Sequence, residues 1–191
     1  METVEVVQPI RDKAKIEAMK KILRGQSLRD YCLFVLGINS GLRVGDLLNL
    51  RVSDVLDERG KLAERISLRE QKTGKRKDFP LGPSAQKALR EYLDAHVLRP
   101  DAPLFPSRKG GTPLDRRSAW RIMSDAAKAV GIAESIGTHT LRKTFGYHAY
   151  QMGMDITRIQ KLLNHSSPGV TLAYIGITRE ELDDVYMTIN L

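Results

Sequence analysis

The chain has 191 residues, 41% of them hydrophobic, which suits one globular domain with a substantial core and leaves too little length for two. No apolar run approaches the roughly 18 residues of a membrane span, the charged N-terminus is unlike a signal peptide, and the single cysteine, Cys32, excludes an internal disulfide and a cysteine zinc cluster. The net charge of +8 favours a polyanionic partner, and we expect a cytoplasmic protein.

The first part of the chain predicts two helices. Residues 12–23 mix charged and apolar side chains at helical spacing, which is typical of a surface helix, and Gly25 would end it. Ser27, with Asp30 three residues later, resembles a capping box and opens an apolar helix that runs to about residue 38. The apolar composition of this second helix predicts that it is buried.

The next segment predicts a turn and then a β-hairpin. Gly41 can end the buried helix, and the leucines that follow anchor another one, so the turn would fix Arg43 at a helix start. Residues 65–71 and 77–81 predict the two short strands of a hairpin. Lys72 would stand near its tip.

The second half of the chain is predicted to be mostly helical. From Ser84 onwards, apolar residues recur at the spacing of an amphipathic helix. A loop rich in proline and glycine follows, and Asp115 opens a further helix that Gly131 closes. The three-residue spacing of His139 and Arg142 places both on one helical face. The whole pattern predicts an α+β fold that is mainly helical, with one small antiparallel sheet.

A short helix with a serine cap and a first-turn proline is predicted after His165, and it would carry Tyr174. Six residues along the chain therefore have side chains suited to phosphate chemistry: Arg43, Lys72, His139, Arg142, His165 and Tyr174. A phosphodiester resists attack because its oxygens are already negative, so cations must neutralise the charge that grows on them. A tyrosine among cations and imidazoles could make that attack without a metal.

These six residues and their order resemble the catalytic domain of the tyrosine recombinases, the family of phage and transposon integrases. In that family an arginine after a helix-ending glycine, a hairpin lysine, a His-x-x-Arg pair, a second histidine and a tyrosine nine residues later form the active site, and the same spacing occurs here. Asn164 departs from the glycine of many relatives, but asparagine also tolerates left-handed backbone. The resemblance covers the chain from about Ile16 to Tyr174, and it implies the fold of these DNA breaking-rejoining enzymes.

The resemblance implies how the protons and the covalent bond are handled. Tyr174 would be the nucleophile that becomes a 3′-phosphotyrosine, which stores the bond energy, so that neither ATP nor a metal nor another cofactor is required. His139 would accept the phenol proton, because free tyrosine is almost entirely protonated at pH 7. Lys72 would give a proton to the leaving 5′ oxygen.

The remaining assignments concern the charge on the phosphate. Arg43 and Arg142 would bind its oxygens, since a guanidinium offers a planar fork of donors that an ammonium lacks. His165 would donate a hydrogen bond to a phosphate oxygen. Asp46, one turn after Arg43, would orient the arginine side chains.

Two of these assignments have competing residues. Lys72 is preferred over the nearby lysines because relatives often show Lys-Thr-Gly at the hairpin turn. Tyr174 is preferred over Tyr186 because Tyr186 lacks a histidine nine residues upstream.

Residues 69–77 hold five basic side chains against one acid, Glu70, which is typical of a phosphate-binding surface. The residues predicted to contact DNA phosphates are Lys75, Arg76, Lys77, Arg108, Lys109, Arg116, Arg117, Arg121 and Lys143.

The resemblance predicts a site-specific recombinase or integrase of bacterial, phage or mobile-element origin that acts on double-stranded DNA. Residues 1–191 would form a single catalytic domain, without the N-terminal DNA-binding domain with which relatives close a clamp around the duplex. Two alternatives stay open. One is a noncatalytic DNA-binding or architectural protein on the same scaffold, and the other is an enzyme that relaxes DNA in the manner of a type IB topoisomerase.

The end of the chain differs in charge from the rest. Residues 180–191 contain four acids and no lysine or arginine, whereas all 31 basic residues precede them. In relatives the segment after the nucleophile often packs on a neighbouring protomer. We expect this tail to dock in trans on a second protomer, supporting a dimer or tetramer on DNA, or in cis over the basic DNA face, and a solvated terminus is the alternative.

Overall fold

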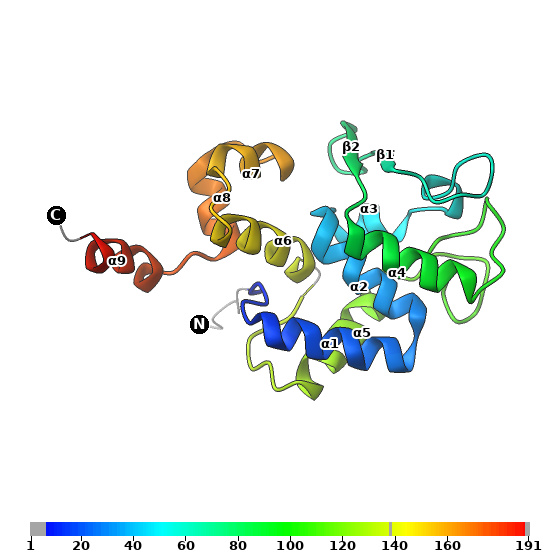
Figure 1. Cartoon of the computed structure of the whole chain (residues 1–191), viewed down its shortest axis with the longest axis horizontal. Helices are drawn as coiled ribbons and strands as arrows, with labels where there is room; N and C mark the ends of the chain where they lie inside the picture. Colours follow the sequence, from blue (N-terminus) through cyan, green and yellow to red (C-terminus); the bar gives the residue numbers. More distant parts are fainter. Residues whose placement is uncertain (1–6, 138, 190–191) are drawn as a thin grey trace.

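The apolar helix α2 (Leu28–Ser40) is the centre of the fold in the computed structural model, which describes residues 7–137 and 139–189. Helices α1 (Lys13–Gln26), α4 (Pro83–Asp94) and α6 (Thr140–Gln151) pack against it (Figure 1). Every residue of α2 from Asp30 to Gly37 is buried, as its composition predicts.

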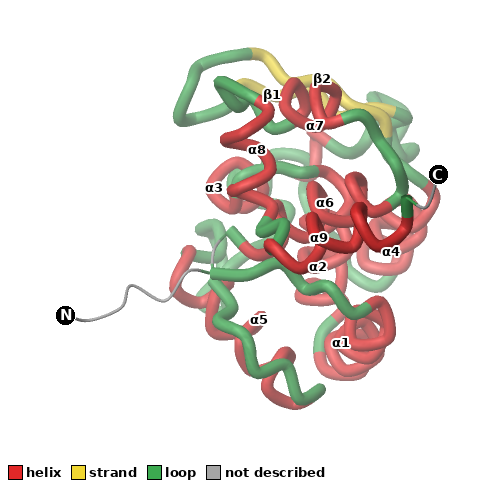
Figure 2. Tube along the Cα trace, turned by 90° about the vertical axis from the view of Figure 1, so that its left-hand side faces the viewer, coloured by secondary structure: helices red, strands yellow, loops and turns green. Residues whose placement is uncertain are grey.

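The other elements surround this centre. They are α3 (Val44–Leu48), the 3-10 helix η1 (Val52–Asp54), β1 (Arg65–Arg69), β2 (Arg76–Pro80), α5 (Arg116–Ala129), α7 (Ile156–Leu162), α8 (Pro168–Ile175) and α9 (Arg179–Thr188). The two strands pair antiparallel, with Arg65 opposite Pro80 and Arg69 opposite Arg76. The hairpin lies on the same side of the molecule as α7 and α8, and α1 and α5 lie on the opposite side (Figures 1 and 2).

Local capping signals set most of the helix boundaries. The Ser27 side chain accepts the Asp30 N–H at the start of α2, and Gly41 ends this helix in the left-handed conformation, with φ of 60°. Both features are as predicted. The prediction that Gly25 ends the first helix is wrong, because α1 continues to Gln26 and the backbone N–H of Ser27 bonds to Leu23. Ser27 therefore closes one helix and opens the next.

The helix that carries Tyr174 belongs to a second, smaller core. Tyr147, Ile159, Leu163 and Ile175 form this cluster, which joins α6, α7 and α8. Gly146 allows the close approach, because a Cβ built there would lie 2.6 Å from a methyl carbon of Ile175. The position of α8 relative to α6 is thus fixed by packing next to Tyr174.

An extended segment at the start of the described chain crosses α6 and reaches the end of α8. The backbone N–H of Ile10 donates to Thr144 Oγ1 at 2.9 Å, and the Ile10 carbonyl lies 2.9 Å from His148 Nε2. Arg11 donates to the carbonyl of Gly176 at 2.7 Å, directly after α8. Residues 10 and 11 therefore support two of the helices that carry candidate catalytic residues.

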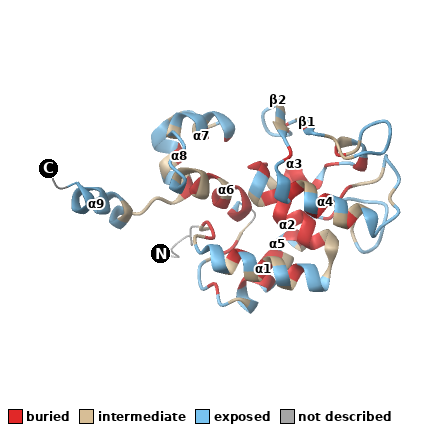
Figure 3. Cartoon of the chain, in the orientation of Figure 1, coloured by how far each residue is buried: buried red, intermediate tan, exposed pale blue. Residues whose placement is uncertain are grey.

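Helix α9 is the most exposed of these elements, and it projects away from the other helices (Figures 1 and 3). None of its residues is buried. Its first turn is nevertheless held, because Glu181 accepts hydrogen bonds from Tyr147 Oη and Gln151 Nε2, both at 2.8 Å. Within the part of the chain that the structure describes, no helix is long and apolar enough to cross a membrane.

Candidate active site

Tyr174 lies on α8, near the imidazole of His139. Ser167 caps this helix through the N–H of Val170, Pro168 occupies its first turn as predicted, and the phenol oxygen of Tyr174 is 3.1 Å from His139 Nδ1. Burial raises the pKa of the Tyr174 phenol, and the charges of Arg142 and Arg43 oppose that rise only in part. The phenol is therefore protonated at neutral pH, and attack requires a base.

His139 has the position and the protonation state of that base. It is the N-cap residue of α6. Burial lowers the pKa of its imidazole, and the nearby charges, Arg142 first among them, lower it further. The ring is thus neutral at pH 7, and in the tautomer that carries its proton on Nε2, Nδ1 accepts from the Tyr174 hydroxyl. A separation of 3.1 Å is within the range for general-base catalysis.

The Arg142 guanidinium joins the ends of two helices. Its side chain is buried in α6, with 2% of the residue exposed. It donates to the carbonyl of Gly41 at 2.6 Å, at the end of α2, and also to the carbonyl of Leu163, just after α7. Burial lowers the pKa of this group, yet a guanidinium remains charged. These bonds fix a cation beside Tyr174.

Arg43 stands at the start of α3, as predicted, and pairs with a buried acid that the sequence interpretation did not assign. Its Nη1 lies 2.9 Å from Oε2 of Glu70, whose side chain is fully buried. Burial on its own would raise the pKa of Glu70, but hydrogen bonds from Thr73 and Arg43 lower it below the ordinary value. Glu70 is therefore ionised, and the pair holds the Arg43 guanidinium in one place.

His165 follows a left-handed residue and faces the nucleophile. Asn164 has φ of 49°, the conformation expected of it, and the rings of His165 and Tyr174 are 4.7 Å apart. The Thr171 hydroxyl donates to the carbonyl of Ser167, so it accepts from His165 Nδ1 at 3.2 Å. Burial and the two arginines lower the pKa of His165 to about 4. In this neutral tautomer Nε2 is an acceptor, so donation to a phosphate oxygen would require the imidazolium.

Of the hairpin lysines, Lys72 is exposed and Lys77 is held. Lys72 lies in the turn after β1, where its charge contributes to lowering the pKa of His139. Lys77 on β2 donates to the carbonyls of Gly41 and Leu162, at 3.3 and 3.2 Å. Burial, with the charge of Arg142, lowers the pKa of Lys77 to about 8. Unlike Lys77, Lys72 is thus free to approach a bound phosphate.

The comparison with known families identifies the family of the chain, and the roles of the six residues stay predictions. Residues 11–181 match the phage integrase family. The chain belongs to this family. The fold agrees, because a mainly helical domain with a two-stranded antiparallel sheet is the tyrosine recombinase catalytic fold predicted from the sequence.

Relatives within the family differ in how much of their length the chain spans. The chain is 42% identical over 183 residues to a probable integrase/recombinase, YoeC, of Bacillus subtilis, covering 96% of this chain and 97% of that protein. It is 34% identical over 163 residues to the tyrosine recombinase XerD of Corynebacterium glutamicum, covering 83% of this chain and 52% of that protein. The chain thus spans nearly all of the first relative and about half of the second.

Solved structures of recombinases share the fold. The crystal structure of XerA recombinase superposes with a TM-score of 0.78 at 25% identity, covering 100% of this chain and 67% of that chain. A lambda integrase dimer bound to a core site superposes with a TM-score of 0.67 at 21% identity, covering 91% of this chain and 61% of that chain.

Two residues that were predicted to belong to this site, Asp46 and Lys143, make contacts that the sequence does not reveal. Asp46 was expected to orient the arginines, which stays a prediction, and its Oδ1 accepts the backbone N–H of Gln71 at 2.8 Å, beside Lys72. Lys143 was expected to meet DNA, and it is buried, with its ammonium 5.2 Å from the centre of the Tyr174 ring. DNA contact by Lys143 stays a prediction.

The basic candidates other than Lys77 and Lys143 lie on the surface. Arg116 reaches α3, because a Cβ built on Gly45 would lie 2.5 Å from its Nη2, and it is therefore close to the Arg43 turn. Arg108, Lys109 and Arg121 line one cavity of about 630 Å³. Three more, Lys75, Arg76 and Arg117, are exposed. Their contacts with phosphates also stay predictions.

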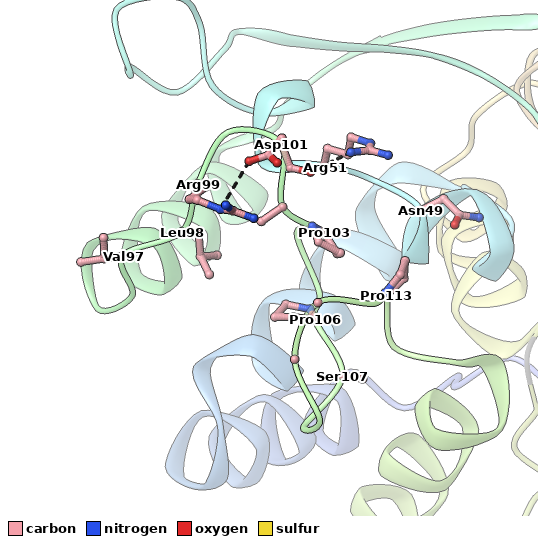
Figure 4. A pocket seen from close by; sticks show the side chains of 13 residues that line it. Asn49, Arg51, Val97, Leu98, Arg99, Asp101, Pro103, Pro106, Ser107 and Pro113 are labelled. Atoms are coloured by element: carbon pink, nitrogen blue, oxygen red, sulfur yellow. Dashed lines mark hydrogen bonds and ion pairs between the residues drawn. The ribbon is translucent and has the colours of Figure 1, made fainter.

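A further hollow lies away from the catalytic residues. It has a volume of about 620 Å³, and Arg51, Val97, Arg99 and Pro103 are among the residues that line it (Figure 4). Arg51 donates to the backbone carbonyl of Asp101 at 2.7 Å there. Its lining residues include none of the six candidate catalytic residues.

Proposed function

We propose that the chain cuts and rejoins DNA strands through Tyr174, as a site-specific recombinase. The observation that carries the proposal is the 3.1 Å contact between the Tyr174 hydroxyl and His139 Nδ1, beside two guanidinium groups. A phenol next to a neutral imidazole can be deprotonated as it attacks, and the cations stabilise the charge that develops on the phosphate.

The proposed reaction needs no group beyond the chain and the DNA. The bond from Tyr174 Oη to phosphorus forms while the bond from phosphorus to the 5′ oxygen breaks, and the phenol proton passes to His139. Lys72 gives a proton to the departing 5′ oxygen. Because a phosphotyrosine retains the energy of the phosphodiester, a 5′ hydroxyl can reverse the step and rejoin a strand without ATP or a metal.

Double-stranded DNA is the proposed partner, and the titles of related structures support it. A XerH site-specific recombinase was solved bound to palindromic difH substrate in a post-cleavage complex, and it covers 95% of this chain at 21% identity, with a TM-score of 0.73. The exposed arginines and lysines around the hairpin and α5 would bind phosphates, so affinity should fall steeply with salt. On this proposal residues 1–191 act as one catalytic domain in the cytoplasm, on the nucleoid.

Covalent capture of DNA tests the proposal directly. A pool of duplexes of random sequence is used, each with a nick that lets the short fragment beyond the cut diffuse away and so traps the adduct. We expect wild-type protein to retain DNA under denaturing conditions, and the captured sequences identify the target. If no adduct forms at any salt concentration between 50 and 200 mM, a range over which phosphate-driven affinity changes by roughly 10³–10⁵-fold, the noncatalytic DNA-binding alternative replaces this proposal.

The selected site also distinguishes recombination from relaxation. Two copies are placed on one supercoiled plasmid and incubated with the wild-type chain. Deletion or inversion of the segment between them supports recombination. Relaxation of the plasmid without strand exchange would favour the type IB topoisomerase alternative.

The rate of cleavage is expected to fall as pH decreases through the pKa of His139. Only the neutral imidazole accepts the Tyr174 proton, and the pKa of His139 is lowered from its ordinary value of about 6.5. The rate should therefore stay level from pH 8 to about 6.5 and decline below that, with no contribution from His165, whose pKa of about 4 lies below the measured range.

The measurement is the rate of adduct formation between pH 5 and 8. DNA is kept well below saturation, since the profile then reports the free enzyme. A decline centred above pH 6.5 would contradict the assignment of His139 as the base.

The C-terminal helix is proposed to dock on a second protomer or over the DNA face. The exposed apolar residues of α9 and of the residue that caps its end include Val185, Met187 and Ile189, and the acids of the tail complement a basic surface. If it docks in trans, deletion of residues 180–191 should reduce dimers or tetramers on the captured site, as measured by gel shift. If it docks in cis, the same deletion should raise DNA affinity. Unchanged assembly and unchanged affinity together would count against both.

A further inference from the structure

We infer that Glu70 is a positioning residue. It holds three segments of the catalytic site in fixed positions relative to one another, an inference that rests on the proposed function. Its carboxylate Oε2 is the common partner of Arg43, Thr73 and Asn164, which we call the Glu70 cluster. Glu70 directly follows β1 and contacts no reacting group in this arrangement. It would act through the residues that do.

Three segments meet at this one oxygen. Arg43 Nη1 approaches from the start of α3 at 2.9 Å, the Thr73 hydroxyl donates from the hairpin turn at 2.7 Å, and Asn164 Nδ2 donates from the end of α7 at 3.0 Å. Each donor is a candidate catalytic residue or its neighbour. Thr73 follows Lys72, and Asn164 precedes His165. The cluster therefore connects the phosphate-binding arginine, the general acid and the second histidine.

The backbone of Glu70 also shapes the turn that carries Lys72. Its N–H donates to the carbonyl of Lys75 at 2.9 Å, and its carbonyl accepts from the N–H of Gly74 at 2.8 Å. The next residue, Gln71, is held to α3 by Asp46. The exposed Lys72 thus extends from a turn whose base is fixed on both sides, which limits where its ammonium can move.

Burial makes this carboxylate difficult to replace. The side chain has no exposed surface, so its charge depends on the three donors for stabilisation. A buried ion pair that loses one partner leaves a charge unpaired, and that cost favours one arrangement of the three segments over alternatives. An ordinary surface ion pair has little such influence, because water replaces the missing partner.

Glu70→Gln is the central test, because glutamine keeps the size and one acceptor oxygen while removing the charge. We expect adduct formation on the selected DNA site to slow by about 10–100-fold, as for a displacement of catalytic groups by up to about 1 Å. DNA affinity should stay within about twofold of wild type. The matched control is Glu91→Gln. Glu91 pairs with Arg24 at 2.6 Å on the surface, and its loss should leave cleavage unchanged.

Single-donor variants test whether the carboxylate acts through its neighbours. Asn164→Gly removes one donor and keeps a residue suited to φ of 49°, and Thr73→Val removes another at nearly constant size. Each should slow adduct formation by a few-fold, and each should have little further effect when combined with Glu70→Gln. Full additivity would overturn the inference, since the donors would then act independently of Glu70. These variants also serve if Glu70→Gln does not fold.

Amide hydrogen exchange gives a measurement that does not depend on cleavage. Residues 71–75 and 164–166 should exchange faster in Glu70→Gln than in wild type, with no change in Glu91→Gln. Wild-type exchange together with wild-type cleavage in Glu70→Gln would overturn the positioning role. If wild-type protein forms no adduct while the exchange difference is present, the proposed function fails and the structural role of Glu70 stands.

Discussion

Tyr174→Phe is expected to abolish covalent capture of DNA while DNA affinity stays within about twofold of wild type. Phenylalanine keeps the ring that packs beside His165 and lacks only the oxygen that attacks phosphorus. Removal of a covalent nucleophile in a serine protease costs on the order of 10⁶-fold in rate, so no adduct should be detectable. Denaturing gels of the captured, nicked site measure the adduct, and gel shift measures affinity.

Tyr186→Phe is the matched control. Tyr186 also lies near the C-terminus, but it is 81% exposed on α9. Its substitution should leave adduct formation unchanged, and peptide mapping of the wild-type adduct should place the DNA on the peptide that contains Tyr174. An adduct that survives Tyr174→Phe and disappears with Tyr186→Phe would assign the nucleophile to the tail.

Local signals in the sequence were sufficient for most of the fold. Ser27, Asp115 and Ser167 cap the helices they were predicted to open, because a side-chain oxygen next to free N–H groups acts within three residues. Gly41 ends α2 for an equally local reason, since it adopts the left-handed conformation. The strands at 65–69 and 76–80 differ by no more than two residues from those predicted, because the turn between them determines their pairing.

Contacts between residues that are far apart in the sequence could not be predicted from local sequence signals. The only sequence signal for Glu70 was that it is the one acid in a basic stretch, and its partners Arg43 and Asn164 are 27 and 94 residues away. Asp46 was predicted to orient the arginines, and its hydrogen bond to the backbone N–H of Gln71 gave no signal in the sequence. Which acid reaches which donor depends on how α3, the hairpin and α7 pack, and no short-range pattern encodes that.

The C-terminal helix shows the same division between local and distant information. Thr178 and Glu181 form a capping box that starts α9, a local sequence signature that is independent of the acidic charge of the tail. The bond from Tyr147 to Glu181 could not be anticipated, because it joins the tail to α6. Charge alone indicated a separate segment and gave no information on where it is attached.

Arg142→Lys is expected to slow adduct formation by about 10²–10³-fold, equivalent to about 2.7–4 kcal/mol in the barrier, as for loss of one donor to a developing oxyanion. The guanidinium of Arg142 spans the carbonyls of Gly41 and Leu163 and still has N–H groups to offer a phosphate. A lysine ammonium is a single point with three donors, so it cannot occupy both positions and also form a bidentate contact.

Loss of cleavage must be separated from loss of the fold, because Arg142 is buried. Loss of one of its bonds to a carbonyl should cost about 1.5–3 kcal/mol, and each kcal/mol lowers Tm by about 2–4 °C in a domain of this size. Adduct formation is therefore measured well below the Tm of the variant. Arg24→Lys is the control, since Arg24 makes a surface ion pair with Glu91 and should tolerate the change in both assays. An Arg142→Lys variant that cleaves within tenfold of wild type would show that charge alone suffices at this position, and the planar fork of donors would then have to be supplied by Arg43.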